Sequence, residues 1–86
     1  MTRATCQAAI RETLTRLTET DASTVPLDAD LGAAIGLDSL GHLELLSEME
    51  DRFDVTIFEA DSDAAATIGG MIDILETALA DKKETA

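Results

Sequence analysis

Aromatic side chains, basic side chains and cysteine are all scarce in this sequence. Phe53 and Phe58 are the aromatic residues among 86, and Trp and Tyr are absent. Proteins that bind single-stranded nucleic acid stack the bases on aromatic rings, so this composition argues against that class. Eighteen acidic residues against six basic ones give a formal net charge of −12. This charge would repel nucleic-acid phosphates and anionic membranes, so we expect basic proteins as partners and neither nucleic acid nor membrane.

Sites that depend on cysteine or on metal ligands are not indicated either. Cys6 is the one cysteine, so an internal disulfide is impossible, and Cys and His residues lack the spacing of a zinc site. The segment from Asp28 to Gly32 lacks the glycine and glutamate positions of a calcium loop, so we expect no metal site. A reducing, cytoplasmic setting fits best. No long apolar run is present, and we expect neither a signal peptide nor a membrane span.

The length of the chain is that of one small domain with a modest core, which excludes a two-domain enzyme. We expect residues 1–86 to form a single domain, with a folded part over about residues 5–80 and a flexible tail over residues 81–86.

Apolar residues recur every three or four positions in three stretches, which is the pattern of amphipathic helices. The predicted helices run from about Thr5 to Thr18, from Asp38-Ser39 to Phe53, and from an N-cap at Thr67 to Leu79. Gly69-Gly70 in the first turn of the last helix indicates that another backbone approaches closely there. The side chains expected to face the core are Cys6, Ile10, Leu14, Leu17, Leu45, Met49, Phe53, Ile68, Met71, Ile72, Leu75 and Leu79.

Residues 19–37 have no such periodicity and are rich in turn-forming residues, which predicts a long loop. Its apolar residues Val25, Leu27, Leu31 and Ile35 are candidates to fix the loop to the core. A short helix has room between residues 58 and 61. The predicted fold class is therefore all-α, a small four-helix bundle with a long loop between helices one and two and a short third helix.

Ser39 lies where the long loop becomes a helix, in the sequence Gly36-Leu37-Asp38-Ser39-Leu40. Backbone N–H groups at a helix N-terminus have no partner within the helix, so a phosphate esterified to Ser39 would lie where an anion is favoured. The simpler interpretation is that Asp38 or Ser39 merely caps the helix.

Asp38-Ser39-Leu40, preceded by a glycine and followed by Leu43-Glu44-Leu45 and by the sequence from Met49 to Phe53, resembles the acyl carrier and peptidyl carrier protein family. The resemblance extends from the first helix to Leu79. It implies a carrier rather than an enzyme. In that family a phosphopantetheinyl transferase moves 4′-phosphopantetheine from coenzyme A to the serine that matches Ser39, which Asp38 flanks. The terminal thiol of this arm then carries acyl or aminoacyl cargo as a thioester.

Acidic residues and two leucines near Ser39 are candidate docking contacts. Glu44, Glu48 and Asp51 would steer basic surfaces of the transferase and of acyl-loading, condensing and tailoring enzymes toward the arm. Leu40 and Leu43 lie off the predicted core row, and core packing is the alternative interpretation of both. We expect the carrier to be a monomer.

The sequence departs from the common pattern of fatty-acid carriers at Gly41-His42, at Phe58 and at Gly69-Gly70. These departures favour a polyketide, nonribosomal-peptide or related specialised pathway over fatty-acid synthesis, which is the alternative. His42 is interpreted as a solvent-facing or interface residue. A further alternative is an acidic helical adaptor that binds basic partners without a prosthetic group.

Overall fold

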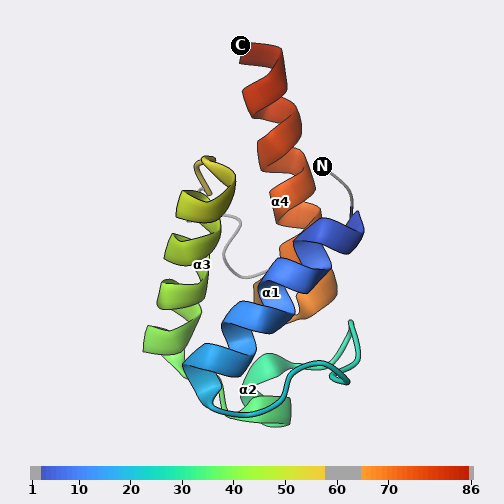
Figure 1. Cartoon of the computed structure of the whole chain (residues 1–86), viewed down its shortest axis with the longest axis vertical. Coiled ribbons are helices and arrows are strands. Elements are labelled where there is room, and N and C mark those ends of the chain that lie inside the picture. The colour runs from blue at the N-terminus through green and yellow to red at the C-terminus, as the bar shows by residue number, and fades with distance from the viewer. Residues whose placement is uncertain (1–2, 58–64, 86) are drawn as a thin grey trace.

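Four helices make up the computed structural model, which describes residues 3–57 and 65–85. They are α1 (Arg3–Thr18), α2 (Leu31–Ile35), α3 (Ser39–Phe53) and α4 (Ile68–Thr85). Helix α1 packs against both α3 and α4, while the short α2 lies near the beginning of α3 (Figure 1). The all-helical, four-helix arrangement predicted from the sequence is confirmed.

The core lies between the three long helices, where the predicted apolar stripes meet. The twelve side chains predicted for it are buried, except that Leu17 and Leu79 are partly buried at its edge. Cys6 is among the buried side chains, as expected for a small core residue. Further buried residues that the periodicity did not single out are Ala9, Thr13, Ala22, Leu46, Ala65 and Ile74.

Helix α2 interrupts the segment that was predicted to be one long loop, so that prediction is wrong over residues 31–35. The carboxylate of Asp30 caps the helix by accepting a hydrogen bond from the N–H of Ala33 at 2.9 Å. Gly36 ends it in the left-handed conformation, with φ of 69°, and donates its N–H to the carbonyl of Gly32 at 3.1 Å. The buried side chain of Leu31 fixes this turn of helix to the core, and that of Ile35 packs at its edge. A helix of five residues is too short to show periodicity, but its two caps are visible in the sequence.

The part of the loop before α2 is held mainly through its backbone. Arg11 donates from Nη1 to the carbonyl oxygens of Ala22 and Val25, at 2.7 and 2.8 Å. Val25 is buried as predicted, whereas the side chain of Leu27 is exposed, contrary to expectation. Instead, the carbonyl of Leu27 accepts a hydrogen bond from the N–H of Gly69 at 2.9 Å. A Cβ on Gly69 would lie 3.1 Å from that oxygen, so the predicted close backbone approach is confirmed.

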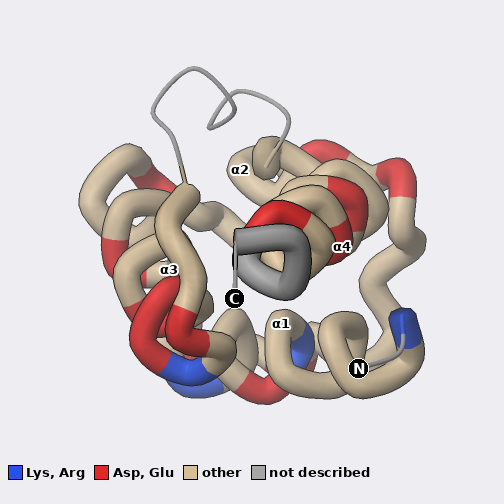
Figure 2. The backbone as a smooth tube through the Cα atoms, turned by 90° about the horizontal axis from the view of Figure 1, so that it is seen from above, with Lys and Arg blue, Asp and Glu red and all other residues tan. Residues whose placement is uncertain are grey.

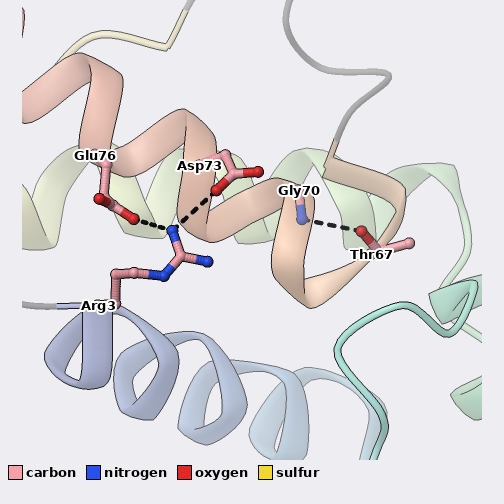
Figure 3. Close-up of polar contacts among 5 residues, drawn as sticks. All are labelled: Arg3, Thr67, Gly70, Asp73 and Glu76. Atoms are coloured by element: carbon pink, nitrogen blue, oxygen red, sulfur yellow. Dashed lines mark hydrogen bonds and ion pairs between the residues drawn. The ribbon is translucent and has the colours of Figure 1, made fainter.

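Helix α4 begins as predicted and ends later than predicted. Thr67 caps it, because the Thr67 Oγ1 accepts a hydrogen bond from the N–H of Gly70 at 3.0 Å (Figure 3). Its far end lies at Thr85, beyond the expected end at Leu79, since Lys82, Lys83 and Glu84 are good helix formers even without an apolar stripe. Arg3 joins α1 to α4 by contacting both Asp73 and Glu76 (Figure 3). The predicted short third helix falls within residues 58–64, outside the described residues.

Candidate functional site

Ser39 is the first residue of α3, and its side chain is exposed. The cap is formed by its neighbour Asp38, whose carboxylate accepts a hydrogen bond from the N–H of Gly41 at 2.7 Å. The carbonyl of Asp38 accepts a second one from the N–H of His42 at 2.9 Å. Of the two residues that could have capped the helix, Asp38 therefore does so. No described residue forms a hydrogen bond with the Ser39 hydroxyl, so this hydroxyl is accessible.

Gly41 gives the first turn of α3 room for two neighbouring side chains. A Cβ at this position would lie 2.8 Å from Cδ1 of Leu37 and 3.1 Å from Oδ1 of the capping Asp38. A larger residue would therefore displace Leu37 or disturb the cap. A glycine this early in a helix costs about 1 kcal/mol relative to alanine, and here the close packing of Leu37 accounts for it.

An open pocket of about 390 Å³ lies beside Ser39, between α2 and the first turns of α3. Its volume is within the range of about 300 to 1,000 Å³ that is usual for ligand pockets. The apolar part of its wall and its polar groups come from segments that are separated in the sequence. The lining residues are Asp30, Leu31, Gly32, Leu37, Asp38, Ser39, His42, Leu43 and Ala66. Among the described residues of this lining, Ser39 is the one that carries a hydroxyl group.

Leu40 and Leu43 are both exposed to solvent, with 64% and 62% of their surface accessible. Core packing, the alternative interpretation of these residues, is therefore excluded. Leu43 also lines the pocket beside Ser39. Two exposed leucines next to the serine form an apolar surface of the kind that protein partners contact.

The three acidic residues predicted for docking differ in their surroundings. Figure 2 shows acidic positions spread over α3 and α4, with few basic positions near them. Glu48 forms an ion pair with Arg16 of α1. Glu44 and Asp51 are exposed, and neither is paired with a cation of the described part of the chain. The structure thus brings Glu44 together with Leu40 and Leu43 at the solvent side, while Glu48 is engaged by α1.

Within residues 3–57 and 65–85, no group of three His, Cys, Asp or Glu side chains is placed to hold a metal ion. None of the described helices has the length and apolar character needed to cross a membrane. The thiol of Cys6 is buried in the core, and this burial raises its pKa, so it is neutral near pH 7.

The profile of a protein family described as "phosphopantetheine attachment site" matches residues 8–75. This match covers most of α1, all of α2 and α3, and the first turns of α4, and it includes Ser39. The chain belongs to the phosphopantetheine-binding carrier family. Members of this family are carriers rather than catalysts, so the predicted class, non-enzymatic role and cofactor are confirmed.

Curated acyl carrier proteins are similar to this carrier over most of their length. The one from an Exiguobacterium species is 29% identical over 79 residues, which are 92% of this chain and 100% of the relative. The one from Amoebophilus asiaticus is 40% identical over 58 residues, 67% of this chain and 72% of the relative. The one from Phaeodactylum tricornutum is 38% identical over 56 residues, 65% of this chain and 74% of the relative.

Sequence reasoning singled out the serine and the leucines of this candidate site but missed the side of the pocket that α2 contributes. Asp30, Leu31 and Gly32 belong to the segment that was taken for a loop, and they line the pocket opposite the first turn of α3. The signal that could have found them is the pair of caps, Asp30 and Gly36, around a short apolar stretch. His42 was interpreted as solvent-facing or as an interface residue, and it is half-buried in the wall of the open pocket.

Proposed function

We propose that this carrier holds its cargo on a 4′-phosphopantetheine arm attached to Oγ of Ser39. The observation that carries the proposal is the exposed, accessible hydroxyl of Ser39 at the first position of α3, inside the span that matches the family. The residues around it fit such a group, because the pocket beside Ser39 is open to solvent and partly apolar. When attached, the arm supplies a terminal thiol that forms a thioester with acyl or aminoacyl cargo.

The carrier's own residues position the attachment point rather than catalyse a reaction. Asp38 fixes the start of α3 through its cap, which holds Ser39 at the end of a rigid helix. Leu37, packed over Gly41, forms part of the pocket beside it. A cargo tethered at this point reacts with a docked enzyme as if within one molecule, so its effective concentration is raised without any catalytic group on the carrier.

The surface formed by Leu40, Leu43, Glu44 and Asp51 is proposed to dock partner enzymes. Its two leucines supply an apolar contact and its carboxylates attract basic surfaces, which increases the rate of encounter. Its partners would be the phosphopantetheinyl transferase and the acyl-loading, condensing and tailoring enzymes of one pathway. Glu48 would contribute less than the sequence suggested, because Arg16 already neutralises it. A cytoplasmic location is proposed, since a thiol carrier requires a reducing compartment.

We further propose that the pathway is a polyketide, nonribosomal-peptide or related specialised one. Support comes from the unusual Gly41-His42 pair, which shapes the pocket wall beside Ser39. The runner-up is fatty-acid synthesis. Incubating the holo-protein with malonyl transferase and the elongation enzymes of fatty-acid synthesis separates the two, because efficient chain elongation would contradict the specialised assignment.

Intact mass measurement after incubation with coenzyme A and a promiscuous transferase tests the attachment site. We expect the mass of one phosphopantetheine to be added to the full chain. Ser39→Ala should stay folded and gain nothing, because the cap that stabilises α3 comes from Asp38. A full gain in Ser39→Ala would contradict the site, and no gain in the wild type would favour the acidic adaptor.

A further inference from the structure

The pocket beside Ser39 contains acidic groups and no strong base. The carboxylates of Asp30 and Asp38 line it, and no Lys or Arg side chain is among the described residues of its wall. A phosphodiester on Ser39 would add another negative charge to this wall. Like charges at close range repel each other, and a hydrogen-bond donor near the phosphate would offset that repulsion. Among the described residues of the lining, His42 is the remaining ionisable side chain.

The backbone at the start of α3 offers less to a phosphate than an uncapped helix would. Four N–H groups at a helix N-terminus lack partners within the helix. At this helix one of them, the N–H of Gly41, already donates to the carboxylate of Asp38. The N–H of His42 makes the first bond within the helix, to the carbonyl of Asp38. The capping carboxylate also offsets the positive end of the helix dipole that would attract an anion. A side chain that donates a hydrogen bond would add to what the backbone offers the phosphate.

We propose that His42 binds the phosphodiester of the arm, with its imidazole donating a hydrogen bond to a phosphate oxygen. This inference rests on the proposed attachment at Ser39. Ser39 and His42 are three residues apart on one helix, which places their Cβ atoms about 5 to 6 Å apart on the same side. Both line the same pocket, and the phosphorus would lie one bond beyond Oγ of Ser39. His42 is thus a positioning residue that fixes the root of the arm.

A protonated imidazole would hold the phosphodiester more firmly than a neutral one. Charge-assisted hydrogen bonds to an anion are about twice as strong as neutral ones. The charged groups that face the imidazole from the described pocket wall are Asp30, at the start of α2, and Asp38, at the start of α3. The phosphodiester itself keeps a single charge between pH 5 and 8.

Phosphorus NMR of the full-length holo-protein between pH 5 and 8 tests the inference. In the wild type we expect the phosphodiester resonance to shift with pH and to show one inflection. In His42→Gln, which keeps a hydrogen-bond donor but cannot titrate, the resonance should not shift. A flat wild-type profile, or the same inflection in the variant, would overturn the proposal. Absence of any phosphodiester resonance would instead contradict the attachment at Ser39.

A matched control places the same titrating group elsewhere. Thr77→His, made in the His42→Gln background, introduces an imidazole at an exposed position of α4 that is not part of the pocket lining. It should not restore the inflection, and restoration would mean that the phosphate senses bulk charge.

Proton NMR adds a second readout, because one histidine and two phenylalanines give few ring signals. Cross-relaxation between the His42 ring and the pantoyl methyl groups is expected, and its absence would contradict the contact.

Discussion

The two sides of α3 differ in what they contact, and together they show how one helix serves both the fold and the carrier function. The inner side carries Leu45 and Met49, which are fully buried against the other helices. At its edge, Arg16 and Arg52 pair with acidic residues across the α1–α3 boundary. The outer side exposes Leu40, Leu43 and Glu44 without a cation from the described part of the chain. The bundle thus uses two of its arginines to attach α3 and leaves the surface near Ser39 apolar and acidic.

The largest expected effect is a difference in the free energy of unfolding between substitutions on the two sides of α3. Met49→Ala removes a buried side chain from the inner side and should lower the free energy of unfolding by about 2 to 5 kcal/mol. Leu40→Ala, on the exposed side, should change it by less than about 0.5 kcal/mol. Urea unfolding followed by circular dichroism measures both. A loss from Leu40→Ala as large as that from Met49→Ala would mean that the outer side is also part of the packed core.

The next effect concerns docking of the outer side. Leu43→Ala should lower kcat/KM of the phosphopantetheinyl transferase by a factor of about 5 to 30, which corresponds to about 1 to 2 kcal/mol. The reason is that an exposed apolar contact is lost from the interface. The loss should persist at high salt, since it does not involve charge. Rates measured at low and high ionic strength test this. An unchanged rate would exclude Leu43 from the docking surface.

The helices that bury a long stripe were predictable, whereas features that depend on a partner from elsewhere in the chain were not. The row of Leu45, Met49 and Phe53 identifies the inner side of α3, because a buried stripe must repeat with the turns of the helix. Helix α2 has too few residues for such a stripe, so only its caps indicated it. The later end of α4 was missed because the apolar period stops before the helix does.

The candidate site shows the same limit. Ser39 and its capping neighbour follow from local sequence, because a cap acts within three residues. The pocket does not, since its wall joins Leu31 of α2 to Leu43 of α3 only through packing. Glu44 and Glu48 are equivalent by spacing on the helix. They differ because Arg16, 32 residues before Glu48, reaches one of them, and no local pattern contains that information.

A smaller effect distinguishes localised recognition from bulk charge. Glu44→Gln raises the net charge by one unit. At low salt it should lower the rate of association with the transferase about fivefold, which corresponds to about 1 kcal/mol. Thr77→Lys raises the net charge by the same amount at an exposed position of α4, and it should have little effect. Stopped-flow association rates compare the two. Equal slowing by both variants would show that partners sense the total charge of the carrier.

The smallest effect tests the role of the ion pair at the edge of the inner side. Glu48→Gln should slow association less than Glu44→Gln does, because Arg16 already compensates the Glu48 charge in the folded protein. Arg16→Gln should release that carboxylate and speed association slightly, and adding Glu48→Gln to it should remove the gain. Each variant should change the stability by less than about 1 kcal/mol, since both side chains are largely exposed to solvent that screens the pair. If Glu48→Gln slowed association as much as Glu44→Gln, Glu48 would belong to the docking surface despite its partner, and the division between the two sides of α3 would lie closer to α1.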